Sequence, residues 1–414
     1  MASRSALNHL RSRRAFDSKH TAATIAATKR TLFCSQQPPQ HPWHSGLKKG
    51  DKVYIGMSGG VDSSVAAHLL KSHGLDVEAV FMRNWDTRDE YNECPSERDW
   101  RDVQRVCQQL EIKCHEVNLV KEYWNSVFSV ALDEYSNGLT PNPDVLCNRE
   151  IKFGVLLEHI GRRRSSPGGW RFATGHYART CPLGCLYRGI DGRKDQSYYL
   201  ANVSAQALGR VVFPLGGLRK VEDVRRIAAE ATLLTANKEE SMGICFVGER
   251  RRFDKFLAEY LPQNPGDILS SDGKRLGTHQ GMFTKTIGQS AGIAGWQEKW
   301  YVYKKDVRNN RMFAVQGRNS PLLHKSSVVA GPVHWISGHM PDLGLRGCID
   351  LDVQIRYMQK PQRCRVSMAC EFDNRDIKQQ YVKVDFDDPQ FGVASGQYLA
   401  LYSSDHCLGS AVIH

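Results

Sequence analysis

The chain has 414 residues, of which 41% are hydrophobic and 24% are charged. This length is enough for two or three domains, and the composition is ordinary for a globular protein. No apolar run approaches the roughly 20 residues of a membrane span, which argues against a membrane protein and predicts no membrane partner. Twelve cysteines without a framework spacing favour a reducing compartment over a disulfide scaffold.

The net charge of +12 is concentrated at the N-terminus. Residues 1–48 hold eight Lys and Arg and one acidic residue, Asp17, so this segment carries +7 and the remainder +5. The segment is rich in Ser, Thr and Ala and has no long apolar core, which is typical of an organelle transit peptide. We predict a leader over 1–47 and import into the mitochondrial matrix; a plastid leader and a disordered basic tail are the alternatives. The residual +5 is compatible with RNA binding.

The first ordered element is an apolar run, Lys52–Met57, that ends in Ser58-Gly59-Gly60-Val61-Asp62-Ser63-Ser64. A helical pattern follows at once. A strand, a glycine turn and a helix start direct backbone N–H groups at one point, which suits an anion. The glycines let the backbone approach a phosphate closely. No lysine follows them, so the loop that grips a transferable γ-phosphate, G-x-x-x-x-G-K-[ST], is not matched.

Strands and helices alternate through the next two hundred residues. Further strands are expected over Val77–Met82 and Trp170–Thr174. Helices are expected after a cap at Ser96, from about Lys121, and through Val221, Val224, Ile227 and Ala228. The alternation predicts an α/β fold with a doubly wound parallel sheet, in which ligands bind beyond the carboxyl ends of the strands.

The pattern changes in the C-terminal half. Residues 251–300 are rich in Gly, Pro and turn dipeptides and indicate a small central domain. From about Tyr301 apolar residues alternate with polar ones, as in Ile349–Tyr357 and Val382–Phe386. This period of two predicts antiparallel strands, in a small C-terminal β-barrel over 301–414. The α/β domain is accordingly expected over 48–250.

Cys147 follows two prolines and lies one helical turn after Asp144. Arg149 and Lys152 add positive charge, and a helix N-terminus would favour the thiolate. Taken alone, a cysteine is more often an inert core thiol. Cys245 lies among apolar neighbours, and its composition alone indicates a structural residue.

These segments together resemble the tRNA-specific 2-thiouridylase family, whose loop is that of the ATP pyrophosphatases. Beyond the loop, the resemblance rests on motifs spread over the whole chain except the leader. They are Asn142-Pro143-Asp144 with Cys147-Asn148, Ala173–Arg179, Lys194–Leu200, Gly243–Arg250, Thr286–Gln289, Arg356-Tyr357 and Ser395–Gln397. Ser290 departs from the family, which usually has arginine after the glutamine.

The resemblance implies a role for each matching residue. ATP would be bound by Gly56, Met57, Ser58, Gly59, Gly60, Val61, Asp62, Ser63, Met82 and Gly175, with Mg²⁺ accompanying the nucleotide and no resident metal site. The target base would meet Asn142, Pro143 and Asp144, with Asp144 a candidate acid/base. Cys147 would be the nucleophile and Cys245 the persulfide carrier. The remaining tRNA contacts would be His176, Lys194, Asp195, Gln196, Arg356, Tyr357 and Gln397.

The implied reaction is ATP-dependent replacement of O2 of the wobble uridine by sulfur, with AMP and pyrophosphate as products. Its partners would be tRNA, here the mitochondrial Lys, Glu and Gln tRNAs, and a persulfide donor linked to a cysteine desulfurase. One alternative is an adenylating ligase with a nitrogen nucleophile, which has no use for two cysteines. Another is an RNA-binding protein with an inactive nucleotide site, which the intact loop speaks against.

Overall fold

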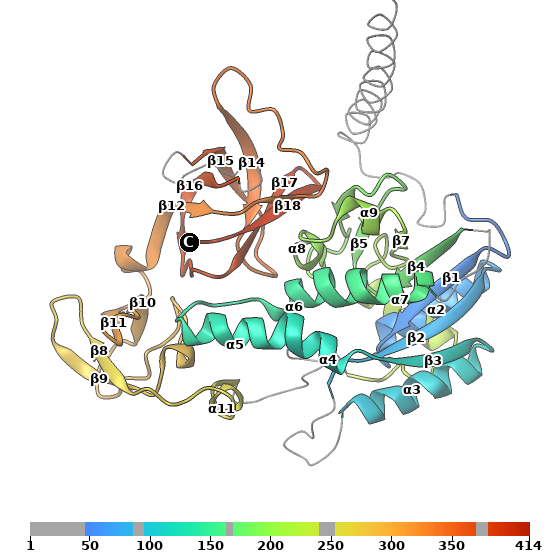
Figure 1. The fold of residues 1–414 in the computed structure, drawn as a ribbon, viewed down its shortest axis with the longest axis horizontal. Coiled ribbons are helices and arrows are strands. Elements are labelled where there is room, and N and C mark those ends of the chain that lie inside the picture. Colours follow the sequence, from blue (N-terminus) through green and yellow to red (C-terminus); the bar gives the residue numbers. More distant parts are fainter. Residues whose placement is uncertain (1–45, 86–94, 163–168, 240–252, 370–379) are drawn as a thin grey trace, which may run out of the picture.

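The computed structural model describes residues 46–85, 95–162, 169–239, 253–369 and 380–414, which form three units (Figure 1). Cys245 and residues 1–45 of the leader predicted over 1–47 lie outside the described residues. Within the described ranges no helix is long and apolar enough to cross a membrane.

The first unit is built on a parallel sheet, which confirms the doubly wound α/β prediction. Its strand order is β3-β2-β1-β4-β7, and every neighbouring pair is parallel. The strands are β1 (Lys52–Met57), β2 (Asp76–Arg83), β3 (Lys113–Asn118), β4 (Trp170–Thr174) and β7 (Val211–Val212). Because β1 lies between β2 and β4, the loop after β1 is flanked by the carboxyl ends of both neighbours.

Helices cover both faces of this sheet because apolar side chains alternate along β1. Val53, Ile55 and Met57 belong to one buried cluster and Tyr54 to the other. The helical segments are α2 (Val61–Ser72), α3 (Pro95–Gln109), α4 (Val120–Tyr123), η1 (Trp124–Phe128), α5 (Ser129–Ser136), α6 (Pro143–Leu146), η2 (Cys147–Val155), α7 (Leu156–Arg162), α8 (Ser197–Leu200), α9 (Ala205–Leu208), η3 (Lys220–Val224) and α10 (Arg225–Glu230).

The helix predicted through Val221 and Ala228 is present as η3 and α10, and the cap predicted at Ser96 is wrong. Ser96 does not cap α3, because the helix begins at Pro95 and the Ser96 hydroxyl donates to Trp85 O at 2.6 Å. Val221 is 72% exposed, while Val224 and Ala228 are buried. The segment Lys220–Val224 is wound as a π-helical turn. The angular spacing of side chains in such a turn differs from that in an α-helix, so Val221 does not share the buried face of Val224 and Ala228.

The second unit consists of α11 (Phe253–Ala258), η4 (Met282–Thr284) and a small sheet. The sheet has the order β10-β11-β8-β9. Its strands are β8 (Gly266–Leu269), β9 (Arg275–His279), β10 (Trp300–Asp306) and β11 (Arg311–Gln316). The strands β10 and β11 were predicted to belong to the C-terminal barrel. Because β10 pairs with β11 and β11 pairs with β8, they belong to the sheet of the second unit instead.

The third unit is an antiparallel sheet that curls into a barrel, as expected. Its order is β12-β16-β15-β14-β17-β18-β6-β5, and a bridge between Ala330 and Ile413 joins β12 to the end of β18. The strands are β12 (His324–Ala330), preceded by η5 (Pro321–Leu323), β13 (His334–Trp335), β14 (Cys348–Gln354), β15 (Gln362–Met368), β16 (Val382–Phe391), β17 (Tyr398–Ser403) and β18 (His406–Val412). The edge strands β5 (Ala178–Thr180) and β6 (Leu186–Arg188) come from the first unit and attach the barrel to it.

Candidate active site

The glycine turn after β1 has the geometry of an anion-binding loop. Gly59 has φ +75°, and a Cβ at this residue would lie 2.8 Å from Asp99 O, so only glycine fits. The Ser58 N–H donates to Ser63 Oγ at 3.2 Å, and the Ser63 hydroxyl donates to Gly60 O at 3.0 Å. Gly60 is the N-cap of α2, so the first N–H groups of that helix open toward the turn.

The other residues expected at the nucleotide lie on the same edge of the sheet. Gly56 pairs with Val80 on β2 and with Thr174 on β4, which brings Met82 and Gly175 beside the loop. A Cβ on Gly175 would lie 2.9 Å from Asp62 C and from Ser63 N. The structure therefore brings together the residues that the sequence assigned to ATP.

A buried lysine holds the aspartate of the loop. Lys220 Nζ lies 2.6 Å from Asp62 Oδ1, and the Tyr177 hydroxyl donates to the same oxygen at 2.7 Å. The side chain of Lys220 is 3% exposed and that of Asp62 is 35% exposed. Lys220 is not among the residues predicted from the sequence, because nothing in its local sequence distinguishes it from a surface lysine at the start of a helix.

A second lysine, Lys238, contacts the backbone of the loop. Lys238 Nζ donates to Gly59 O at 3.1 Å and pairs with Asp99 Oδ1 at 3.0 Å and Asp102 Oδ2 at 2.6 Å. The Arg225 guanidinium fixes this segment by donating to the carbonyls of Ala236 and Lys238. Lys238 was also missed. It compensates the charge of two carboxylates of α3 that lie beside the turn.

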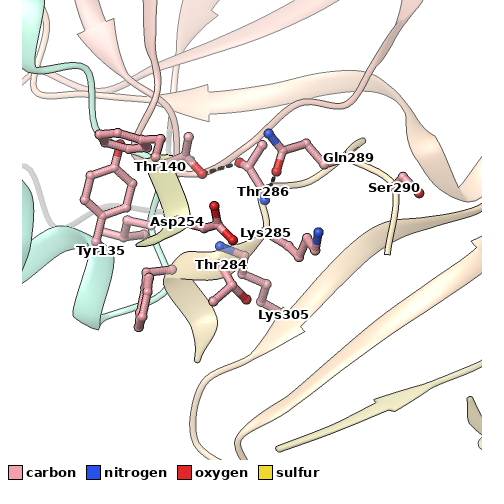
Figure 2. A pocket seen from close by; sticks show the side chains of 12 residues that line it. Tyr135, Thr140, Asp254, Thr284, Lys285, Thr286, Gln289, Ser290 and Lys305 are labelled. Carbon is pink, nitrogen blue, oxygen red and sulfur yellow. Dashed lines mark hydrogen bonds between the residues drawn. The ribbon is translucent and has the colours of Figure 1, made fainter. Parts of the chain in front are cut away.

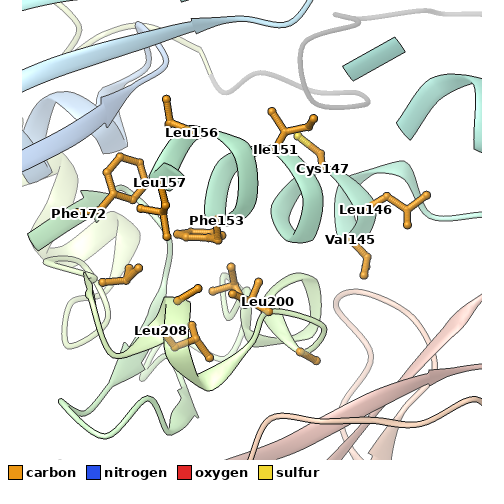
Figure 3. Packing of buried hydrophobic residues seen from close by; sticks show 14 of the residues in the cluster. Val145, Leu146, Cys147, Ile151, Phe153, Leu156, Leu157, Phe172, Leu200 and Leu208 are labelled. Atoms are coloured by element: carbon orange, nitrogen blue, oxygen red, sulfur yellow. The ribbon is translucent and has the colours of Figure 1, made fainter. Parts of the chain in front are cut away.

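Cys147 is positioned by the helix start that the prolines predicted. The Asn142 side chain caps α6 by accepting from the Val145 N–H at 3.3 Å, Pro143 is its first residue, and Asp144 lies in its first turn. Cys147 is 1% exposed and begins a π-helical stretch, η2, whose apolar side chains share a buried cluster with Phe172 of β4 and Leu200 of α8 (Figure 3). Such π-helical insertions occur often at functional sites.

Asn84 links Cys147 to the sheet edge. It follows β2 directly and is fully buried, and its Nδ2 lies 4.0 Å from Cys147 Sγ. Within the described residues, Asn84 Oδ1 and Asn148 Oδ1 are buried without a hydrogen-bond partner. Buried amide oxygens of this kind are available to donors of a bound molecule.

Cys245 lies outside the described residues, but the chain on either side of it is anchored. Lys238, seven residues before Cys245, is bound at the nucleotide loop. Helix α11 begins eight residues after Cys245, and its Phe256 ring lies 6.2 Å from that of Trp85, the neighbour of Asn84.

The expected tRNA contacts of the first unit differ in accessibility. Asp195 is buried, and its carboxylate binds Arg188 Nε at 2.9 Å and accepts from Gly189 N and Ser197 N, so its evident role is to hold this turn. Lys194 and Gln196 beside it are partly exposed. His176 Nδ1 forms a hydrogen bond of 2.7 Å with the Thr174 hydroxyl. Burial, and secondarily the charge of Lys152, lowers the pKa of His176.

The expected tRNA contacts of the barrel lie close to the Cys147 helix. The Tyr357 ring packs on the Tyr199 ring at 4.5 Å, and Tyr199 O accepts from Asn148 Nδ2 at 3.3 Å. Arg356 donates to Phe391 O, and burial together with the neighbouring Arg318 lowers the pKa of Arg356.

The barrel also touches the chain just before Asn142, where Thr140 N donates to Ser395 O at 2.9 Å. This contact brings the Ser395–Gln397 turn, which carries the expected tRNA contact Gln397, beside the target-base residues. Among the described residues, no three His, Cys, Asp or Glu side chains converge on a possible metal site.

Three family models match the chain along its length. The tRNA methyl transferase HUP domain matches residues 51–249, the tRNA methyl transferase PRC-barrel domain residues 254–316, and the aminomethyltransferase β-barrel domain residues 325–413. These spans follow the three units of the fold.

Curated bacterial proteins match over nearly their whole length. The tRNA-specific 2-thiouridylase MnmA of Legionella pneumophila is 43% identical over 371 residues, covering 87% of this chain and 98% of that protein. The protein of the same name from Bacillus pumilus is 44% identical over 367 residues, covering 87% and 94%.

Among solved structures, the U34-tRNA thiolase NcsA of Methanococcus maripaludis matches with 16% identity, a TM-score of 0.28, and coverage of 57% of this chain and 72% of that one. A 4-thiouridine synthetase in complex with RNA matches with 18% identity, a TM-score of 0.29, and coverage of 51% and 50%. At these TM-scores neither structure carries weight in the assignment.

Proposed function

This chain belongs to the tRNA-specific 2-thiouridylase family, and we propose on that premise that it catalyses ATP-dependent 2-thiolation of a uridine in tRNA. The finer proposal is that the target is the wobble uridine of mitochondrial Lys, Glu and Gln tRNAs. The observation that carries the proposal is the contact between Asn84 and Cys147, because it places a thiol beside the strand edge that carries the nucleotide loop.

Activation of the base requires ATP, since the C2 oxygen of uracil is a poor leaving group. We propose that this oxygen attacks the α-phosphate, that pyrophosphate leaves into the turn Ser58–Ser63, and that AMP later leaves C2. Asp62 Oδ1 is occupied by Lys220 and Tyr177, but no described residue bonds to its Oδ2. That oxygen fits a Mg²⁺ ion bound with ATP, which would neutralise phosphate charge.

Sulfur would come from a persulfide on Cys245. In one route its terminal sulfur attacks C2 and AMP leaves; the Cys147 thiolate then attacks the Cys245 sulfur and resolves the intermediate as a Cys147–Cys245 disulfide. In the other, Cys147 attacks first and frees sulfide, which attacks C2. Both routes consume two electrons per turnover, which an external thiol restores by reducing the disulfide. Asp144, one turn before Cys147, is the proposed acid/base.

The tRNA would approach across the junction of the three units. Asn142, Pro143 and Asp144 would meet the target base, which must leave its stack to reach Cys147. The proposed contacts around it are His176, Lys194, Gln196, Arg356, Tyr357 and Gln397, with Asp195 supporting its neighbours. A persulfide donor linked to a cysteine desulfurase would be the protein partner. Import into mitochondria is proposed from the composition of 1–47.

The experiment supplies the full chain with ATP, unmodified tRNA and a persulfide donor, and measures 2-thiouridine and pyrophosphate. Cys147→Ser and Cys245→Ser should abolish thiolation. Cys348→Ser is the matched control, because Cys348 is a partly exposed thiol on β14 of the barrel. Unchanged thiolation in either of the first two variants refutes the sulfur route. Pyrophosphate formed with an amine acceptor and no RNA would favour the ligase instead.

A further inference from the structure

A cavity of about 520 Å³ lies between the first and second units, away from the nucleotide loop (Figure 2). Its walls come from the end of α5, from α11, from the segment around η4 and from β10. This volume is within the usual range for a small-molecule or single-nucleotide site, roughly 300–1,000 Å³. The site residues derived above do not line it.

Two lysines that form no ion pair with a described carboxylate line this cavity. Lys305 Nζ donates to Gly138 O at 2.9 Å, and no described carboxylate forms an ion pair with it. Burial lowers the pKa of Lys305 to about 8. Lys285 makes no hydrogen bond or ion pair with any residue in the described ranges. Asp254 is the one acidic side chain among the lining residues, so the wall carries an excess of positive charge.

Part of the remaining wall is aromatic, beside hydroxyl and amide side chains. Tyr135, Phe253 and Phe283 contribute aromatic rings to the lining, and the Tyr135 and Phe253 ring centroids are 5.9 Å apart. The three aromatic residues are partly exposed. Aromatic rings in a positively charged groove are the features by which proteins hold single-stranded nucleotides, since every base has a π-face to stack on.

The cavity borders the chain that leads to the target-base residues. Thr140 is hydrogen-bonded to Thr286, and both line the cavity (Figure 2). Asn142 follows Thr140 by two residues. A ligand in the cavity is therefore a close neighbour of a base held at Asn142–Asp144.

We propose that this cavity binds an unstacked nucleotide of the anticodon loop that flanks the target uridine, with its phosphate at Lys285 and Lys305 and its base against the rings of Tyr135, Phe253 and Phe283. The proposal rests on tRNA being the substrate. It assigns the second unit a direct part in substrate recognition rather than that of a spacer.

The test measures binding of an unmodified tRNA transcript as a function of salt. Lys285→Ala should weaken binding about tenfold and lower the slope of log K against log[salt] by about 0.7, the value for one lost single-strand phosphate contact. Lys304→Ala is the matched control, because Lys304 is an exposed neighbour on β10 whose Nζ lies over the Phe313 ring at 5.6 Å, outside the cavity lining. It should leave the slope unchanged. Lys305→Met should, like Lys285→Ala, weaken tRNA binding and lower the salt slope.

Two further measurements separate the possible failures. The KM for ATP should be the same in Lys285→Ala as in the wild type. If the wild type binds and thiolates tRNA while Lys285→Ala keeps the wild-type affinity and slope, the subsite is refuted and the proposed function stands. An equal loss of tRNA affinity in Lys304→Ala would also refute the subsite, since the effect would then come from the overall positive charge of this surface. Inorganic phosphate that binds the wild type but not Lys285→Ala, and that does not displace tRNA, would assign the cavity to a free anion and overturn the proposal. A wild type that neither binds nor thiolates tRNA refutes the function itself.

Discussion

Lys220 Nζ lies 2.6 Å from Asp62 Oδ1, although the two residues are 158 positions apart in the sequence. The lysine side chain is 3% exposed, so its charge is desolvated where it pairs with the loop aspartate. An uncompensated carboxylate at this position would repel the phosphates of ATP. Lys220 is thus a positioning residue that makes the loop acceptable to an anion.

Lys220→Met should raise the KM for ATP about tenfold or more, because a hydrogen bond to a charged group contributes about 1.5–3 kcal/mol and the partial exposure of Asp62 puts the effect at the low end. Affinity for tRNA should not change. Pyrophosphate release against ATP concentration measures this, and Lys220→Arg should retain part of the affinity. A KM within about twofold of the wild type would show that the pair is not needed for ATP binding.

Lys238→Met should also weaken ATP binding, because it leaves Asp99 and Asp102 beside the turn without their counter-ion. The second substitution Asp102→Asn should restore part of the affinity, since it removes one of the two repelling charges. ATP titration of the single and double variants measures the coupling. If Lys238 acted only by holding Gly59 O, the double variant would be no better than Lys238→Met.

Gly175→Ala should destabilise the protein by about 1–3 kcal/mol and reduce ATP binding, because the new Cβ would press on the backbone of Asp62 and Ser63. Denaturant unfolding and ATP titration measure the two effects. Gly217→Ala is the control, since a Cβ there would meet no atom within 4 Å. Equal behaviour of the two variants would contradict the close contact between β4 and α2.

Stability should fall as the pH drops below about 6.5, the ordinary pKa of histidine. Burial lowers the pKa of several histidines, so the unfolded chain binds more protons than the folded chain in this range. They are His176, His279, His334 and His406. His406→Gln should shrink the difference between urea midpoints at pH 7.5 and 5.5, whereas the exposed His339→Gln should not. An unchanged difference in His406→Gln would show that His406 does not contribute.

Much of the fold followed from the sequence because its signals are local. A buried run ending at Met57 and a glycine turn at Gly59-Gly60 specify a strand, a phosphate-sized turn and a helix start within a dozen residues. Asn142 and Pro143 likewise place a helix N-terminus one turn before Cys147. The alternation of apolar and polar residues around Leu351 and Val353 was enough to predict a barrel strand, since successive side chains of any strand point to opposite faces.

Other features depended on contacts that local patterns do not encode. The boundary between the second and third units could not be located, because β10 and β11 alternate like barrel strands and only the pairing of β11 with β8 assigns them to the central sheet. The exposure of Val221 likewise could not be predicted, because it depends on the π-helical winding of Lys220–Val224, and the packing around a turn sets its winding.

The sequence by itself therefore determined the order of the elements, the glycine turn after β1 and the helix start before Cys147. Only the tertiary structure decided which charges surround that loop. Lys220 and Lys238 lie far from it in the chain, and the sequence around a lysine does not indicate which carboxylate it pairs with. Ion pairs form between side chains that folding brings together, so their identity is a property of the packed structure and not of either segment.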